Sequence, residues 1–298
     1  MSNLAKTIFT HMRPDLDACA SVWAVRTYVP DAKQLSIRFV PANWNGRGRE
    51  RRPNDFLLDL SAGTKGELID GRRHSCFALL MKQYAPLEDQ VALRSLIDFV
   101  DATDSTGSAY LALAPQLTQE QARLFASTGL SAVISALAVA PDASDEYVVS
   151  AMCLILDGMR QRALAFQRKL EMAKDPNVVK RFTTNAGETV CLVIGAQGMG
   201  GVLFSEGPHI RFVIYTSPSG LEYGVNRSDL VPDLDIHNPQ VQQILAEAGE
   251  KDGWFVHPNG FLLAWGTSKA PAKRQSRVQA TDLAQAYIAY LESLRPAV

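Results

Sequence analysis

The stretch THMRPDLDACASVWAVRTYV, residues 10–29, sets a cluster of ionisable side chains directly before an apolar, alanine-rich run. Residues 7–10 have the composition of a short strand, and the apolar run over residues 16–28 predicts a helix. In open α/β sheets ligands bind beyond the carboxyl ends of the strands, so the turn after a first strand is where reactive groups converge. That turn holds three candidate ligands, His11, Asp15 and Asp17.

The two carboxylates of this turn are separated by one residue. Alternation along the chain sends Asp15 and Asp17 in different directions, which suits two neighbouring cations better than one. Imidazole together with carboxylates favours Mn²⁺ or a similar ion. The alternative is that the two acids are the N-cap and a first-turn residue of the helix, since both positions favour negative charge. The turn alone leaves both interpretations open.

The segments that follow alternate between strands and helices. Apolar runs over residues 35–40 and 56–60 predict two further strands, and helical patterns dominate residues 77–140. Apolar strands that alternate with helices are typical of a parallel sheet covered by helices. The sequence therefore predicts an α/β fold, with a largely parallel sheet flanked by helices on both faces in the amino-terminal domain.

The chain of 298 residues exceeds one typical domain. Ser144 and the acids behind it open a long helix that ends before Asp175 and Pro176. Strand-rich segments broken by Gly and Pro begin near Glu188. We therefore expect three segments: a first domain over residues 1–143, a helical connector over 144–184 and a smaller α+β domain over 185–298.

Composition and motif searches exclude several function classes. The net charge of −1 gives no long-range field of the kind that marks a nucleic-acid or membrane binder. No apolar run approaches the roughly 18 residues of a membrane span, and the amino terminus lacks the core of a signal peptide, so we expect a cytoplasmic protein without a membrane partner. The chain has no GxSxG elbow, and residues 195–201 lack dinucleotide or P-loop spacing. Four scattered cysteines predict neither disulfides nor a zinc site.

Further ionisable residues follow the later strand patterns. Asp59 ends the most apolar strand, where a buried carboxylate costs several kcal/mol unless it binds a cation. Asp70 and His74 follow in ELIDGRRHSCF. The motif DFVDATDSTG contributes three more carboxylates, Asp98, Asp101 and Asp104.

The order of these motifs is H-x3-D-x-D, a strand-end Asp, an Asp/His cluster and a further Asp motif, and it resembles the DHH phosphoesterase superfamily. Members of that superfamily use two Mn²⁺ ions to hydrolyse phosphoric anhydrides or phosphodiesters. The segments VDATDSTG and WFVHPNGFLLAWGTSKAP are most similar to the branch that contains the melanocyte-proliferating-gene exonucleases, whose second domain binds substrate. The resemblance covers most of the chain.

The resemblance implies a dinuclear centre with the ligands His11, Asp15, Asp17, Asp59 and either Asp101 or Asp104. In such a centre His11 and Asp15 hold one ion. Asp17 belongs to the second ion, and Asp59 bridges the two. The resemblance implies two Mn²⁺ ions, with Mg²⁺ or Co²⁺ as alternatives, and such a pair activates water and offsets charge on the phosphoryl oxygens.

The third motif departs from that family. Members carry consecutive Asp-His-His, where the first histidine ligates metal and the second contacts substrate, whereas this chain reads DGRRH over residues 70–74. Either His74 fills the vacancy, which Gly71 permits, or Arg72 and Arg73 supply positive charge and grip the substrate phosphate. His74 and Arg72 are therefore catalytic candidates, and Arg73 is a substrate-binding candidate. A solvated loop is the alternative for both arginines.

The second domain and a basic loop offer further binding candidates. His257, with Gly260 allowing close backbone approach, is a candidate contact for a phosphate or a base, and a structural histidine is the alternative. Lys269 lies in GTSKAPAKRQSR, a basic run suited to a polyanionic substrate, although such runs are more often solvated. The loop NWNGRGRERRPND is rich in arginine, but Trp44 is its single aromatic side chain.

These features predict a Mn-dependent phosphoesterase that directs metal-activated water at a phosphodiester or phosphoanhydride. The preferred substrate is a short single-stranded oligonucleotide or a dinucleotide, and a small phosphorylated metabolite is its competitor. The alternative function is a catalytically degenerate relative that binds a phosphorylated ligand or nucleotide without hydrolysing it. A homodimer is compatible with each of these functions.

Overall fold

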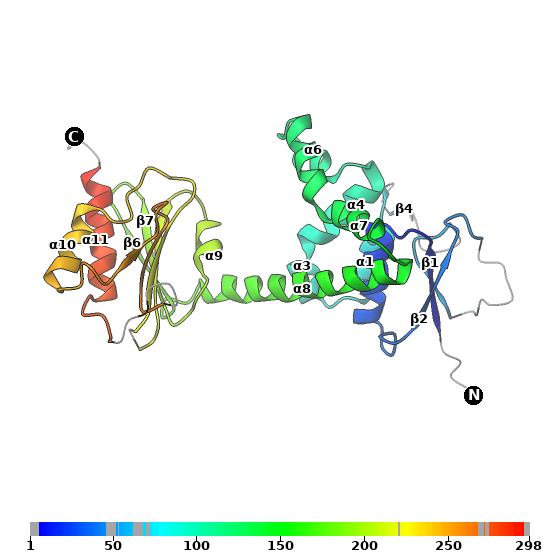
Figure 1. Ribbon diagram of the computed structural model, residues 1–298, viewed down its shortest axis with the longest axis horizontal. Coiled ribbons are helices and arrows are strands. Elements are labelled where there is room, and N and C mark those ends of the chain that lie inside the picture. The colour runs from blue at the N-terminus through cyan, green and yellow to red at the C-terminus, as the bar shows by residue number, and fades with distance from the viewer. Residues whose placement is uncertain are drawn as a thin grey trace. The chain divides into compact units, whose positions relative to one another are not determined.

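The computed structural model describes residues 6–45, 52, 54–61, 68, 69, 72–219, 221–267, 271 and 274–294. For residues 68, 69 and 72 this description covers the backbone alone. The chain divides into two compact units, residues 1–165 and 166–298, and each unit is described by itself (Figure 1).

A three-stranded parallel sheet lies at the centre of the first unit. Its strands are β1 (Thr7–His11), β2 (Ser36–Val40) and β3 (Phe56–Leu57), in the order β2-β1-β3. The predicted strands are confirmed, and so is the α/β fold. Because β1 is the middle strand, its carboxyl end at His11 lies between the ends of two neighbours. A separate antiparallel pair consists of β4 (Leu68–Ile69) and β5 (Arg72–Arg73).

Helices cover one face of this sheet. Helix α1 (Leu16–Tyr28) is buried from Leu16 to Val25, as expected for a helix that is apolar on nearly all sides. It packs with Ile8 of β1 and with α2 (Cys76–Tyr84) in one core that includes Trp23 and Phe77. This packing fixes the direction in which the chain leaves β1.

The other face of the sheet has a different cover. Phe9 points to this side and stacks on Trp44, with ring centroids 5.0 Å apart. Leu57 and Leu60 complete this small cluster. Within the described residues, helices therefore cover one face of the sheet and Trp44 covers the other, whereas the sequence predicted helices on both.

Further helices complete the first unit, namely α3 (Leu87–Ala92), α4 (Arg94–Thr106), α5 (Ala109–Leu113), α6 (Gln119–Thr128) and α7 (Leu130–Ala138). Helix α4 packs against α1 and α2, and α7 also packs against α1. Helix α4 ends at Gly107, whose φ of +72° is a common way to end a helix. Both α4 and α7 therefore lie next to the helix that follows the candidate turn.

The division between the units falls inside one long helix, α8 (Asp145–Met172). Val149, Met152 and Leu156 on its first half belong to the core of the first unit. Strand β6 (Val179–Thr183) starts the second sheet, so part of that sheet lies within the residues expected for the connector. Among the described residues, no helix is both long and apolar enough to cross a membrane.

The second unit contains a six-stranded mixed sheet in the order β10-β11-β9-β8-β7-β6. Its strands are β6, β7 (Thr189–Ile194), β8 (Ile210–Thr216), β9 (Tyr223–Arg227), β10 (Phe255–Val256) and β11 (Leu262–Trp265). The β7–β8 pair is parallel and the other pairs are antiparallel.

Helices flank both faces of this second sheet (Figure 1). Helices α10 (Pro239–Glu247) and α11 (Ala280–Ser293) pack on one face, and the short α9 (Gly200–Phe204) packs on the other. The predicted α+β character of the carboxy-terminal part is confirmed. All four cysteines of the chain are free thiols.

Candidate metal centre

The turn between β1 and α1 has a fixed backbone path. The amide of Met12 donates to the carbonyl of Val40 at 2.8 Å, which extends the β1–β2 pairing by one residue. Arg13 then adopts a φ of +53°, and Pro14 is buried. Asp15 is the N-cap of α1, where its Oδ1 accepts a hydrogen bond from Ala18 N at 3.0 Å. The capping role considered from the sequence is therefore present.

His11 is buried at the carboxyl end of β1 between two carboxylates. Its Nε2 lies 3.0 Å from Asp59 Oδ2 and 3.6 Å from Asp15 Oδ1. Its Nδ1 donates to the carbonyl of Met12 at 2.9 Å, so Nε2 is the nitrogen available to a ligand. The carboxylates of Asp15 and Asp59 raise the pKa of His11 to about 10. The protonated imidazole of His11 is a positive charge that these carboxylates attract.

Asp59 is fully buried just after β3. Its backbone has a φ of +50°, a conformation that aspartate tolerates better than most residues. The amide of the preceding Leu58 donates to Phe9 O at 2.9 Å, which anchors the segment to β1. The sheet thus brings Asp59 to His11 across 48 positions of sequence.

Asp17 lies in the first turn of α1 and binds the start of α2. Its Oδ2 accepts from Cys76 N at 2.9 Å, and its Oδ1 accepts from Phe77 N at 2.8 Å. Burial and the charge of Asp59 raise the pKa of Asp17 to about 8, although the two amides oppose this shift. The carboxylate is held rigidly in a place where negative charge needs compensation.

The ionisable side chains form two groups that share Asp59. One group is His11, Asp15 and Asp59, and the other is Asp17, Asp59 and Asp104. Within each group, the potential ligand atoms all lie within 4.8 Å of one another. One imidazole and four carboxylates form a donor set of the kind that Mn²⁺, Mg²⁺ and Co²⁺ accept. The residues present therefore fit a pair of divalent ions.

Helix α4 contributes Asp104 to the second group, whereas its Asp101 contacts His74 and Ser75. Asp101 Oδ1 accepts from Ser75 N at 2.7 Å, and its Oδ2 accepts from His74 Nδ1 at 3.1 Å. Neither Asp101 nor His74 belongs to the groups found among the described residues. The structure thus brings Asp104 to Asp17 and Asp59, and it pairs His74 with Asp101.

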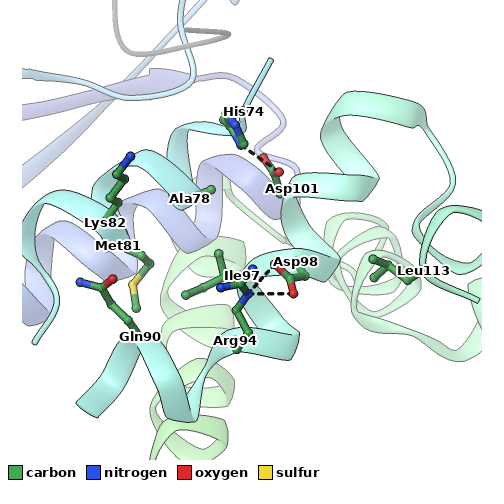
Figure 2. Close-up of a pocket in the computed structure, with 10 residues that line it drawn as sticks. All are labelled: His74, Ala78, Met81, Lys82, Gln90, Arg94, Ile97, Asp98, Asp101 and Leu113. Atoms are coloured by element: carbon green, nitrogen blue, oxygen red, sulfur yellow. Dashed lines mark hydrogen bonds and ion pairs between the residues drawn. The ribbon is translucent and has the colours of Figure 1, made fainter. Parts of the chain in front are cut away.

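Figure 2 shows the pocket that His74 and Asp101 line instead, a hollow of about 570 Å³ between α2 and α4. Asp98 lies in the same pocket and is paired with Arg94, whose Nε is 3.0 Å from its carboxylate. Asp98, the first carboxylate of DFVDATDSTG, is therefore paired at the surface and belongs to neither of the two groups.

The basic candidates near the third motif are only partly described. Arg73 is exposed in β5, and the side chain of Arg72 lies outside the described residues, as do Asp70 and Gly71. In the loop before β3, residues 46–51 also lie outside them. No contact of these arginines with the two groups is therefore described.

The candidates of the second unit have local structural contacts. His257 packs between Phe255 and Phe261, and its Nδ1 accepts a hydrogen bond from Asn259 N at 3.2 Å. Gly260 has a φ of +64° in the turn between β10 and β11. Lys269 lies outside the described residues. The observed contacts of His257 are those of a side chain that stabilises this turn.

A second cavity, of about 490 Å³, adjoins the two candidate ligand groups. Asp15, Asp17 and Asp104 form part of its wall. Sequence reasoning missed the rest of the polar lining, which consists of Arg13, Thr103, Ser131 and Ser135. Arg13 lies within residues 10–29, next to the predicted ligands. No feature of the sequence links the hydroxyl residues of α4 and α7 to this turn.

No family model and no curated protein matches this sequence. A crystal structure of an uncharacterized protein from Helicobacter pylori G27 aligns with 97% of this chain and 99% of its own, at 12% identity and a TM-score of 0.24. A member of the s1p family of ribosomal proteins, described as a DHH domain, aligns with 95% of this chain and 87% of its own, at 12% identity and a TM-score of 0.31. At such TM-scores neither similarity carries functional information.

Proposed function

We propose that this protein is a metal-dependent phosphoesterase of the DHH type. The observation that carries the proposal is the pair of ligand groups that share the buried Asp59. A shared carboxylate is what a dinuclear centre needs, because it holds two cations next to each other. The sequence motifs that resemble the DHH superfamily supply the same residues in the same order, and this agreement supports the assignment.

His11 and Asp15 would hold one ion, Asp17 and Asp104 the other, and Asp59 both. The bound pair, with Mn²⁺ as the first choice and Mg²⁺ or Co²⁺ as alternatives, would lower the pKa of a water and offset charge on the phosphoryl oxygens. The chain itself contributes rigidity. Met12 O orients the imidazole, and the amides at the start of α2 orient Asp17.

The substrate is proposed to be a phosphodiester or phosphoanhydride that enters the cavity beside the two groups. Its volume of about 490 Å³ lies in the range of small-molecule sites. A short single-stranded oligonucleotide or a dinucleotide is the substrate that the resemblance favours, as in exonucleases of that branch. A small phosphorylated metabolite is the competing class.

A second candidate function is a degenerate relative that binds a phosphorylated ligand without hydrolysing it. The observation in its favour is the third motif. His74, its sole histidine, pairs with Asp101 and belongs to neither ligand group. A centre short of one nitrogen ligand would hold its second ion weakly.

The test is calorimetric titration of chelator-stripped protein with Mn²⁺, together with hydrolysis of a short RNA and of bis(p-nitrophenyl) phosphate. We expect two ions per chain and turnover that requires the metal. Asp98→Asn is a matched control, because Asp98 lies in the same motif as Asp104 but is paired with Arg94. If neither compound is turned over, whether two ions, one ion or none is bound, the result would favour the binding protein and refute the phosphoesterase.

A further inference from the structure

The cavity beside the ligand groups has a chemically mixed lining. Asp15 and Asp17 of the turn after β1 and Asp104 of α4 contribute carboxylates. Helix α7 contributes the hydroxyl groups of Ser131 and Ser135, which are one helical turn apart. Apolar side chains also line the cavity, among them Val100 and Ile134. A ligand in this cavity would thus meet acids, hydroxyl groups and apolar groups.

Arg13 is the one cation among the described residues that line this cavity. It is exposed, and no described residue forms an ion pair or a hydrogen bond with its guanidinium, although three carboxylates line the same cavity. The carboxylates have other partners: Asp15 caps α1, for example, and Asp17 binds the α2 amides. The guanidinium therefore remains available to an anion.

The backbone at Arg13 supports a functional reason for this residue. A φ of +53° is unfavourable for a residue other than glycine, and the position before Pro14 favours extended conformations instead. Glycine or asparagine would adopt this conformation more easily. An arginine in such a conformation is most simply explained by what its side chain binds.

The residue types that line the cavity indicate which kind of molecule would carry the anionic group. None of the described lining residues is aromatic. Bases of single-stranded nucleic acids are usually held by stacking on aromatic rings. The hydroxyl groups of Thr103 and Ser135 donate to the carbonyls of Phe99 and Ser131 at 2.8 and 3.0 Å, and their oxygens can still accept. Together with the hydroxyl of Ser131 they suit a ligand whose own hydroxyl groups donate.

We infer that this cavity is a site for a small phosphate ester with a hydroxylated body, and that Arg13 is its anion-binding, specificity-determining residue. This inference rests on the proposed function. Of the two substrate classes considered there, it selects the small phosphorylated metabolite over the oligonucleotide or dinucleotide. With the carboxylates neutralised by divalent ions, the planar guanidinium binds two oxygens of the phosphate group. The α7 hydroxyls face the rest of the molecule.

The first test measures binding of inorganic phosphate to the Mn²⁺-loaded protein by calorimetry. Arg13→Gln removes the charge, and we expect it to weaken phosphate binding about tenfold to a hundredfold, the effect of losing charge-assisted hydrogen bonds. Arg13→Lys keeps the charge but lacks the planar guanidinium that binds two oxygens, so we expect its affinity for phosphate to lie between those of Arg13→Gln and wild type. Arg94→Gln, an arginine that lines the other pocket and pairs with Asp98, should bind like wild type.

Titration with Mn²⁺ alone separates this inference from the proposed function. If Arg13→Gln binds Mn²⁺ and phosphate like wild type, the role of Arg13 is refuted and the metal centre stands. If wild type binds no Mn²⁺, both are refuted. Weakened phosphate binding at unchanged Mn²⁺ stoichiometry and melting temperature supports the inference, because a misfolded variant would lose all three.

The second test compares glycerol 3-phosphate with a 5′-phosphorylated diadenylate as competitors for bound inorganic phosphate. The absence of described aromatic lining predicts that glycerol 3-phosphate competes at least as well as the diadenylate. Base stacking would favour the diadenylate by about tenfold or more. A preference of that size for the diadenylate would overturn the small-ester class.

Discussion

Asp59 is the residue on which both ligand groups depend. It is fully buried, and it belongs to the group with His11 and to the group with Asp17. The change Asp59→Asn keeps the shape of the side chain but removes its negative charge. We expect the affinity for Mn²⁺ at both sites to fall by more than about a hundredfold, beyond what changes outside the ligand set cost. Titration calorimetry measures this loss, and full metal binding by a folded Asp59→Asn variant would contradict the shared-ligand assignment.

Asp101 and Asp104 offer a matched pair on one helix. Because Asp104 belongs to the second ligand group, Asp104→Asn is expected to reduce Mn²⁺ binding from two ions to one. Asp101→Asn removes the negative charge beside His74 but keeps an acceptor for Ser75 N, and it is expected to leave two ions bound. Metal stoichiometry measured on both variants checks the prediction. It fails if Asp101→Asn is the variant that loses an ion.

The sequence could not distinguish these two aspartates. Residues three apart on a helix point in similar directions, so spacing gives both the same chance to reach the turn. The packing of α4 against α1 and α2 decides between them, since it places Ser75 N next to Asp101. For Asp15 the sequence left two interpretations open, a helix cap and a metal ligand. The structure shows that they are compatible, because Asp15 caps α1 and also belongs to a candidate ligand group.

At the scale of elements, the turn between β1 and α1 carries a conformational cost. Arg13 has a φ of +53°, where asparagine is better tolerated than arginine. Arg13→Asn is therefore expected to raise the free energy of unfolding by up to about 1 kcal/mol while it weakens phosphate binding about tenfold to a hundredfold. Chemical denaturation of both proteins measures the difference. Met12→Asn, at an exposed neighbour without positive φ, is the control and should not stabilise the protein.

Local sequence patterns predicted the strands and helices around this turn well. Continuous apolar runs fit buried parallel strands, and the alanine-rich run after Asp17 fits a helix buried on nearly all sides. The cover of the second sheet face was missed, because the stacking of Trp44 on Phe9 depends on how the loop after β2 folds back. Periodicity carries no information about such a contact.

At the scale of the whole molecule, the two units have separate cores. Trp23, Phe77 and Met152 lie in the core of the first unit, and Phe212 and Tyr287 lie in a core of the second. The sequence indicated two units from the change to strand-rich patterns near residue 188. It also indicated a helical connector over residues 144–184, and the division between residues 165 and 166 falls within that range, inside α8.

Separate cores predict that metal binding stabilises one unit selectively. Leu291 is fully buried in the second unit, and Leu291→Ala is expected to destabilise that unit by about 2–5 kcal/mol. Every member of the two ligand groups lies in the first unit, so Mn²⁺ stoichiometry should not change. Ligand binding to the folded state raises stability with concentration, so Mn²⁺ should raise the transition of the first unit alone.

Scanning calorimetry with and without Mn²⁺ checks this prediction, with Leu156→Ala as the matched change in the core of the first unit. Leu291→Ala should shift one transition downwards and leave the metal-sensitive transition in place. Leu156→Ala should lower the metal-sensitive transition instead. A single transition that responds to Mn²⁺ and to both substitutions would mean that α8 couples the units into one cooperative structure, and the selective effect of the metal would then be refuted.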